Sequence, residues 1–379
     1  MAIALEELVG LRHDLHRHPE LGYLEKRTHD VVCRRLRDLG IDFRGSLAGG
    51  TGVVAHLPAT KPGGGCIALR ADMDALPVTE QTELPYASTT PGVMHACGHD
   101  GHTTILLGTA AELSSSERPH DVLLMFQPAE EGGAGAAKLV ADGALEGEFY
   151  PKADLVYGLH GVPHWPVGHL STRVGPLMAA ATQFKITIRG RGTHAAYPHW
   201  GRDPIVGLSQ VIVGLQTVAS RLTSPLTPVV VTVGKIEAGV AHNVIPETAV
   251  LHGTVRALDD ATDAAAKEAV ERIVTLTAEA HGLTADVVWS DGYPVVVNDP
   301  KATERFFKTV EAEQEPEPSM GGEDFSFYGR VAPACFFFLG LRPEGADSYP
   351  NLHAPNFDFN DNAIRPGIEA MVALATAPI

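Results

Sequence analysis

The spacing of apolar and polar residues divides the first half of the chain into short strands that alternate with helices. Apolar residues recur at helical spacing after Leu5 and again over residues 28–39, where Gly40 marks an expected helix end. Continuous apolar runs predict buried strands at residues 52–57, 66–71, 122–126 and 154–159, and helical stretches lie between some of them at 103–113 and 135–145. This alternation favours an α/β fold with a mostly parallel sheet.

The pattern changes after Gly175. Residues 184–189 alternate strictly between apolar and polar, as a half-buried strand does. The following elements are predicted as a helix, two strands, a helix and a strand, at residues 204–220, 229–236, 249–255, 260–281 and 285–290. This β-α-β-β-α-β order is that of a ferredoxin-like α+β unit.

The last part of the chain returns to the first pattern. A helix at residues 301–313 and an apolar strand at residues 334–339 would complete the first sheet. We therefore predict a large α/β domain, formed by residues 1–177 and 291–379, and an inserted domain at residues 178–290.

Composition and charge narrow the function classes. The 379 residues carry a formal net charge of −17, which disfavours binding to phosphate backbones or anionic lipid surfaces. No uninterrupted apolar run reaches the roughly 18 residues of a membrane-spanning helix, and the N-terminus shows no secretory signal pattern. The four cysteines lie far apart, which suits a reducing compartment. We expect a cytoplasmic protein with neither a nucleic-acid nor a membrane partner.

Residues 94–104 contain the densest group of side chains that can carry chemistry. They include His95, Cys97, His99, Asp100 and His102. Thiolate, imidazole and carboxylate groups are the ligands that divalent transition metals prefer. In an extended loop, the side chains at 95, 97 and 99 would project to one side. The plainer alternative is a polar loop that begins a helix near His102, and in either case one loop cannot complete a metal site.

Further candidate residues follow the predicted strands, where sites form in open α/β sheets. Of two adjacent glutamates in an extended loop, one can bind a metal while the other faces a bound water. A carboxylate behind a metal-binding imidazole would fix its tautomer. Each of these residues could instead be a solvated turn, a structural histidine or a helix cap. The candidates are Asp72, Asp74, Glu130, Glu131 and His160, with His353 in a Pro-rich loop near the C-terminus.

The inserted domain carries three candidates of its own. His194 lies in a Gly-rich turn after a strand, and Asn243 and Arg256 add an amide and a guanidinium to the same domain. Arginine suits bidentate capture of a carboxylate. A turn histidine and a surface charge are the alternatives.

Together these motifs resemble the M20 metallopeptidase family, and specifically its amidohydrolase branch of hippurate, N-acyl-amino-acid and auxin-conjugate hydrolases. The resemblance runs in collinear order along almost the whole chain, so the joint pattern is far more specific than any one piece. The motifs that carry it are Arg12-His-Asp-Leu-His16, Pro19-Glu-Leu-Gly22, Ala71-Asp-Met-Asp-Ala-Leu-Pro77, His95-Ala-Cys-Gly-His-Asp-Gly-His102, Pro128-Ala-Glu-Glu-Gly132, His194-Ala-Ala-Tyr-Pro-His199, Asn243-Val-Ile-Pro246, Gly253-Thr-Val-Arg256, Met320-Gly-Gly-Glu-Asp-Phe325 and His353.

The resemblance implies a site for two divalent metal ions. Cys97 takes the place of the bridging carboxylate of other M20 enzymes. His99 and His160 would complete one ion, and Glu131 and His353 the other. The mixed sulfur, nitrogen and oxygen ligands suit zinc best, while manganese, nickel and cobalt fit similar sites.

The resemblance also implies catalytic and substrate-binding roles. Glu130 would be the general base, and Asp74, rather than Asp72, would support a metal-binding histidine. Asn243 and Arg256 match contacts to the substrate carboxylate. His194 matches a lid histidine that enters the active site of the partner subunit, which implies a homodimer through the inserted domain, with a tetramer as a further assembly.

Two positions depart from the usual pattern of the branch. Gly322 stands at a substrate-binding position where a small polar residue is common. Thr193 stands where a second glycine often precedes the lid histidine.

The implied reaction is hydrolysis of the amide bond of a small N-acyl amino acid. The alternatives are a dipeptidase or carboxypeptidase of the same fold, a thiol hydrolase that uses Cys97, and a non-catalytic binding protein. A thiolate held by a metal is not free to attack, which weighs against the thiol hydrolase. The pair Glu130 and Glu131 weighs against a mere binder, because binding needs no base beside its ligands.

Overall fold

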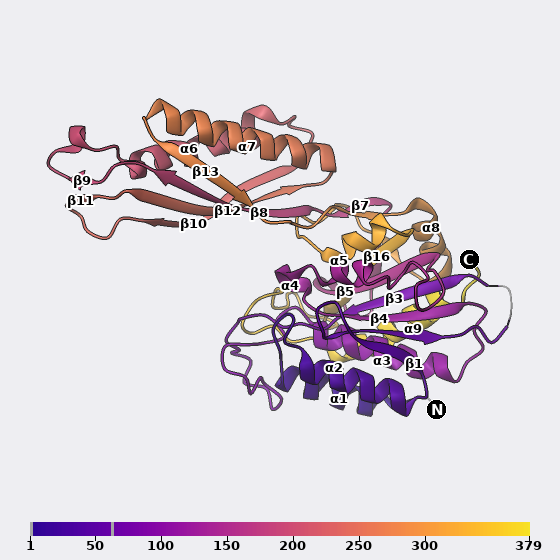
Figure 1. Cartoon of the computed structure of the whole chain (residues 1–379). Coiled ribbons are helices and arrows are strands. Elements are labelled where there is room, and N and C mark those ends of the chain that lie inside the picture. The colour runs from indigo at the N-terminus through magenta and orange to yellow at the C-terminus, as the bar shows by residue number, and fades with distance from the viewer. Residues whose placement is uncertain (1–2, 62–63) are drawn as a thin grey trace. The chain divides into compact units, whose positions relative to one another are not determined.

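The computed structural model describes residues 3–61 and 64–379, which form two compact units (Figure 1). The first unit contains the chain through Leu177 together with Val297–Glu317 and Asp324–Ile379. The second contains Met178–Val296 and Pro318–Glu323.

An eight-stranded mixed sheet forms the centre of the first unit. Its order is β1 (Asp42–Leu47), β2 (Gly52–Leu57), β4 (Asp121–Gln127), β3 (Cys66–Asp72), β5 (Leu155–Pro166), β16 (Ala334–Arg342), β6 (Leu170–Thr172) and β15 (Glu313–Gln314). The four central strands, β4, β3, β5 and β16, are parallel to one another. Every residue of β3 is buried, which explains why such strands appear in the sequence as continuous apolar runs.

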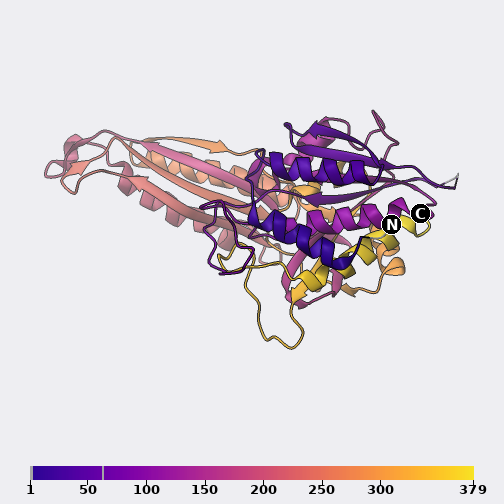
Figure 2. The same cartoon turned by 90° about the horizontal axis from the view of Figure 1, so that it is seen from below.

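Helices cover this sheet. Figure 2 shows α1, α3 and α9 side by side, and all three contact one another. Gly108 allows the close approach of α3 and α9, because a Cβ added there would lie 2.3 Å from Cδ1 of Ile368. The helices of the unit are α1 (Leu5–Arg17), α2 (Lys26–Asp38), α3 (His99–Ser114), α4 (Glu130–Gly133), α5 (Gly135–Ala141), α8 (Pro300–Thr309) and α9 (Ile364–Thr376), with 3-10 helices η3 (Asp324–Arg330) and η4 (Asp361–Ala363).

The second unit has a four-stranded antiparallel sheet in the order β10 (Val229–Ala238), β12 (Thr248–Ala257), β8 (Ala180–Arg189) and β13 (Thr284–Trp289). Helices α6 (Pro204–Thr217) and α7 (Asp260–Ala280) pack on one face of it. The strict alternation of β8 places Phe184, Ile186 and Ile188 in the core of the unit. The chain order and strand order are those of the predicted ferredoxin-like unit, and the predicted fold class is confirmed.

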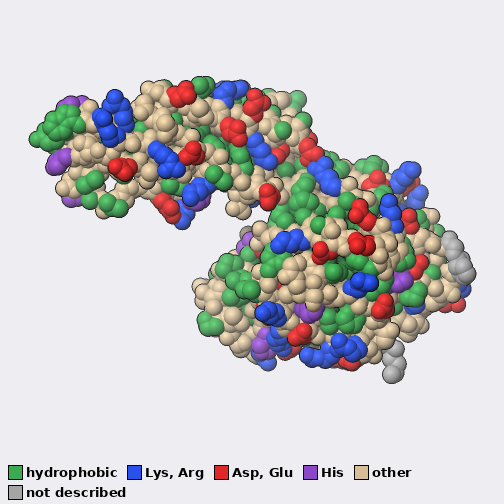
Figure 3. Space-filling view, in the orientation of Figure 1, with side chains coloured by type: hydrophobic (Ala, Val, Ile, Leu, Met, Phe, Trp, Pro, Cys, Tyr) green, Lys and Arg blue, Asp and Glu red, His purple; other side chains and the backbone are tan. Residues whose placement is uncertain are grey.

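Short elements complete the structure. Strand β9 (Thr193–His194) pairs with β11 (Val244–Ile245), and β7 (Gly175–Met178) pairs with β14 (Val296–Asn298). The 3-10 helix η1 (Pro198–Trp200) follows β9. Hydrophobic and histidine side chains gather at the end of the second unit that carries β9 and β11 (Figure 3).

One helical segment, Pro204–Leu222, is long and apolar enough to cross a membrane by length and composition alone. It consists of α6 and the π-helical turn η2 (Val218–Leu222). One face of the segment, with Leu208, Val211 and Leu215, lies in the core of the second unit. The opposite face is exposed, because 28% of the apolar window is buried.

Some predicted bounds were wrong. The helix predicted at residues 135–145 ends at Ala141, and the one predicted at residues 301–313 ends at Thr309. Strand β1 was not predicted, because no residue on this edge strand is buried and its sequence, DFRGSL, gives no apolar run.

A buried charge network joins α1 to the first turn of α3 and to the loop before it. His16 Nδ1 lies 2.9 Å from Oδ2 of Asp100, and its Nε2 lies 3.3 Å from Oε1 of Glu80. Burial alone would lower the pKa of His16, but the hydrogen bond and charge of Asp100, with the hydrogen bond to Glu80, raise it to about 9. His16 is therefore a buried cation at neutral pH.

This network predicts a pH-dependent stability. A raised histidine pKa stabilises the fold below its ordinary value of 6.5, and that contribution is lost as the pH rises toward 9. We expect His16 to lose roughly 2 kcal/mol of stabilisation between about pH 6.5 and pH 8.5. Urea unfolding of the wild type and of His16→Gln across this window measures the difference. Parallel curves for the two proteins would show that His16 is not charged.

Candidate metal centre

The loop before α3 supplies two candidate ligands. Gly98 adopts φ +86°, a left-handed conformation that turns the chain into the helix, so His99 is already its first residue. The predicted helix start near His102 was therefore wrong. His95 does not join the cluster that Cys97 and His99 form, because the chain is not extended through residue 99.

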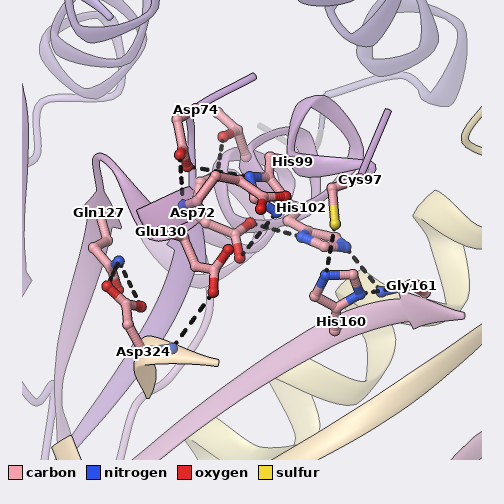
Figure 4. Close-up of polar contacts among 12 residues, drawn as sticks. Asp72, Asp74, Cys97, His99, His102, Gln127, Glu130, His160, Gly161 and Asp324 are labelled. Carbon is pink, nitrogen blue, oxygen red and sulfur yellow. Dashed lines mark hydrogen bonds and ion pairs between the residues drawn. The ribbon is translucent and has the colours of Figure 1, made fainter. Parts of the chain in front are cut away.

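His160 lies within β5 and not at its end, because this strand continues to Pro166. Its Nε2 lies 3.3 Å from Sγ of Cys97, as Figure 4 shows. Its Nδ1 lies 2.8 Å from the carbonyl oxygen of Gly161 and must donate a proton to it. This leaves the lone pair of Nε2 facing the sulfur.

His353 reaches the same sulfur from the C-terminal loop. Its Nε2 lies 3.3 Å from Sγ of Cys97 and 3.1 Å from Oε1 of Glu131. The residue has φ +65°, and its N–H donates to the carbonyl oxygen of Ala96 at 2.7 Å. That bond ties the His353 loop directly to the Cys97 loop.

The five predicted ligands thus form two overlapping groups. One contains Cys97, His99 and His160, and the other contains Cys97, Glu131 and His353, with all ligand atoms of each group within 4.8 Å of one another. Ligands bound about 2.0–2.3 Å from one tetrahedral ion lie roughly 3.3–3.8 Å apart. The two sulfur–imidazole distances of 3.3 Å agree with that spacing.

The local chemistry also fits bound cations. Nε2 of His99 is buried and has no hydrogen-bond partner among the described residues. Burial and the charges of Glu131 and Glu130 hold the pKa of the Cys97 thiol well above its ordinary value. A divalent ion would supply the positive charge that stabilises the thiolate. A reactive thiol needs a lowered pKa instead, so this environment opposes the thiol hydrolase alternative.

Asp74 supports one ligand from each group. Its Oδ1 lies 3.2 Å from Nδ1 of His99, and its Oδ2 accepts the backbone N–H of Glu131 at 2.9 Å. The carboxylate therefore fixes His99 with Nε2 directed into the cluster. Asp72 bonds to His102 at 2.7 Å, and its Oδ2 lies 3.7 Å from Nε2 of His99.

Glu130 lies beside the ligands but outside both Cys97 groups. It is within 4.8 Å of His99 and Glu131, and its side chain is almost fully buried. The backbone N–H of Asp324 approaches its Oε1 at 3.4 Å (Figure 4). Glu130 also forms a possible ion-binding group with His99 and Glu131, but it lies outside the two groups that share Cys97. A carboxylate in that position is placed to exchange a proton with a water held there.

The loop that carries these two glutamates is strained. Ala129 and Ala134 have φ +52° and +53°, a left-handed conformation that costs roughly 1–2 kcal/mol for a residue with a Cβ. Buried carboxylates hold the loop: Glu25 accepts the N–H of Ala129 at 2.8 Å, and Asp324 accepts the N–H of Ala136 at 3.0 Å. Glu25 was not among the predicted residues, whereas Asp324 lies in a motif that was noticed only for its resemblance.

The remaining predicted residues belong to the second unit. Nδ1 of His194 accepts the N–H of Ala196 at 3.0 Å, so a neutral ring carries its proton on the exposed Nε2. Asn243 is a near neighbour, because its carbonyl accepts the N–H of Ala195 at 3.0 Å. His194 and Asn243 therefore share one end of this unit.

Arg256 and Gly322 lie at the other end of the second unit. Arg256 on β12 pairs with Ala181 on β8, and a Cβ added at Gly322 would lie 2.3 Å from Cβ of the same Ala181. Strand β12 extends from Thr248 to Ala257, so at about 3.3 Å per residue Arg256 is roughly 25 Å from the end that leads to Asn243. One copy of this unit cannot bring both side chains to the same carboxylate.

The first unit thus has an α/β fold whose site gathers one thiol, three imidazoles and two carboxylates into overlapping groups that could hold divalent ions, as in dinuclear metal-dependent hydrolases. Comparison with known proteins agrees. Residues 68–377 match the model of peptidase family M20/M25/M40. The chain belongs to this family and is an amidohydrolase within it.

The relatives cover nearly the whole chain. An N-acetyl-L-cysteine deacetylase of Bacillus subtilis is 43% identical over 365 residues, which cover 95% of this chain and 85% of that protein. IAA-amino acid hydrolase ILR1-like 4 of Arabidopsis thaliana is 40% identical over 382 residues, covering 97% and 85%. The crystal structure of the Bacillus subtilis YxeP protein, described as a dinuclear metal binding peptidase from the M20 family, superimposes with a TM-score of 0.81 at 34% identity, covering 98% of this chain and 97% of that one.

Proposed function

We propose that this amidohydrolase cleaves the amide bond of N-acyl amino acids and that Glu130 is its general base. The observation that carries the proposal is the position of Glu130. It lies beside the two overlapping ligand groups that share Cys97 and belongs to neither of them. The names of two relatives, which specify N-acetyl-L-cysteine and IAA-amino acids, support this substrate class.

The roles of the residues follow from their positions. Two divalent ions, with zinc the best match to the ligands, would supply Lewis acidity toward water and the amide carbonyl. His99, His160, Glu131 and His353 would hold them, with Cys97 common to both. Glu130 would accept a proton from the attacking water and return it to the leaving amine. Asp74 would keep His99 and Glu131 in place throughout.

A substrate panel tests this proposal. The purified protein, analysed for its metal content, is assayed with hippurate, N-acetyl amino acids, indoleacetyl amino acids and dipeptides. Turnover of the acylated amino acids, lost with a chelator and restored by added metal, is the expected result. Turnover of dipeptides alone would favour the second candidate, a dipeptidase or carboxypeptidase, which the peptidase description of the YxeP protein supports.

We also propose that the second unit forms a homodimer. Strand β10 is a ten-residue edge strand, and such edges are ready to pair with another chain. Next to it, α6 exposes the apolar side chains of Ile205, Val206 and Val213. Because His194 and Arg256 lie at opposite ends of the unit, a second copy would be needed to bring groups of both kinds to one substrate.

The dimer makes a testable prediction. Val206→Lys combined with Val213→Lys changes two exposed positions, so the fold should persist while the apolar contact between copies is lost. We expect a monomer by light scattering after gel filtration, with strongly reduced turnover and normal metal content. Val288→Lys is the matched control, because it is also exposed but lies on β13, the opposite edge strand. An unchanged dimer in the double variant would contradict this interface.

A further inference from the structure

The third histidine of the His95–His102 motif is not placed to bind an ion. His102 is fully buried, and both of its ring nitrogens are engaged. Nδ1 lies 2.7 Å from Oδ1 of Asp72, and Nε2 lies 2.8 Å from the backbone nitrogen of Gly161. A backbone N–H can only donate, so Nε2 must be the acceptor and Nδ1 must carry the proton. The lone pair that a metal would need is therefore already used.

The partner of His102 is the residue next to a predicted ligand. Gly161 follows His160, and its carbonyl accepts the proton of His160 Nδ1 at 2.8 Å. Strand β5 pairs with β3 as far as Gly158. The N–H of Gly161 lies beyond these paired residues and donates to His102. Gly161 is also closely packed, because a Cβ added there would lie 2.8 Å from Cδ1 of Leu341.

Asp72 completes the chain of contacts. It is fully buried and accepts a hydrogen bond from Nη1 of Arg70 at 2.5 Å. A continuous series of hydrogen bonds therefore runs from Arg70 through Asp72 and His102 to Gly161, and from Gly161 to His160. Figure 4 shows the part from Asp72 to His160. It ends at Nε2 of His160, 3.3 Å from Sγ of Cys97.

We infer that His102 is a positioning residue for His160. By holding the N–H of Gly161, it fixes the backbone that orients the His160 imidazole toward the ion shared with Cys97 and His99. This inference rests on the proposed two-ion site. It predicts a selective effect, because His102 reaches His160 through Gly161, whereas the series continues to His353 only through Sγ of Cys97 in the hydrogen bonds of the described residues.

Two variants of similar size separate positioning from packing. His102→Gln keeps an acceptor for the N–H of Gly161, whereas His102→Met fills the space without one. Metal-free protein is titrated with Co²⁺, and the thiolate and ligand-field absorption bands report the two binding steps. We expect His102→Met to weaken one of the two steps about 10–100-fold and to leave the other unchanged. His102→Gln should restore most of that loss.

Controls make the result decisive. Thr109→Val removes a buried hydroxyl that bonds to Ile105 within the same helix, and it should change unfolding without changing either Co²⁺ step. If His102→Met does not fold, His102→Asn, whose shorter amide cannot reach Gly161, replaces it. Equal weakening of both steps, no weakening, or no rescue by Gln would overturn the inference. Two intact Co²⁺ steps in a wild type that cleaves no N-acyl amino acid would instead overturn the proposed function alone.

Discussion

Glu130→Gln is expected to lower kcat by about 10²–10⁴-fold while both metal ions stay bound. The amide has nearly the shape of the carboxylate but cannot accept the water proton. Glu130 also groups with His99 and Glu131, but the two groups that share Cys97 stay complete without it, so we expect metal affinity to change little. Initial rates with the best substrate of the panel, together with elemental analysis of the same sample, measure both quantities.

Glu131→Gln is the matched comparison for this experiment. It makes the same chemical change one residue away, but in a side chain that lies 3.1 Å from Nε2 of His353 and belongs to a ligand group. This variant should lose one ion, whereas Glu130→Gln should keep two. Near-normal turnover in Glu130→Gln would remove Glu130 from the role of base.

Cys97→Ala is expected to weaken both ions, because its sulfur is the one atom common to the two groups. We expect loss of stoichiometric metal and of nearly all turnover. His353→Ala removes a member of one group only and should leave the ion at His99 and His160 in place. Isothermal titration of the metal-free variants gives the number of sites and the affinity of each.

The same cysteine separates the metal hydrolase from the thiol alternative. Burial and nearby carboxylates keep the pKa of the Cys97 thiol well above its ordinary value, so the metal-free thiol should react slowly with alkylating agents. Bound metal should protect it further. Rapid alkylation that abolishes turnover of the metal-loaded protein would favour a thiol nucleophile.

The sequence predicted the central strands well because their burial leaves a direct trace. Strands such as β3 and β4 are covered on both faces, so nearly every position must be apolar. The candidate ligands had a weaker trace. Residues 95–102 stood out by composition, whereas His160 and His353 were only weak candidates by position, and the family resemblance was needed to favour them over structural histidines.

Other features could not be predicted because they depend on contacts between distant segments. Glu25 accepts a hydrogen bond from the N–H of Ala129, and nothing in the sequence around either residue specifies that contact. The continuation of β5 past His160 depends on its pairing with β16, because Gly161 pairs with Leu339. The separation of Asn243 from Arg256 follows from strand register, which is fixed only when the sheet forms.

The hydrogen bonds from the backbone of the Glu130–Glu131 loop to buried carboxylates have a consequence for the metal-free protein. Glu25, Asp74 and Asp324 each accept a backbone N–H of that segment, at 2.8, 2.9 and 3.0 Å. All three contacts join protein atoms, so the backbone of this loop should keep its shape when metal is removed. Slow hydrogen exchange of the amides of Ala129, Glu131 and Ala136 in metal-free protein is the expected sign of such preorganisation.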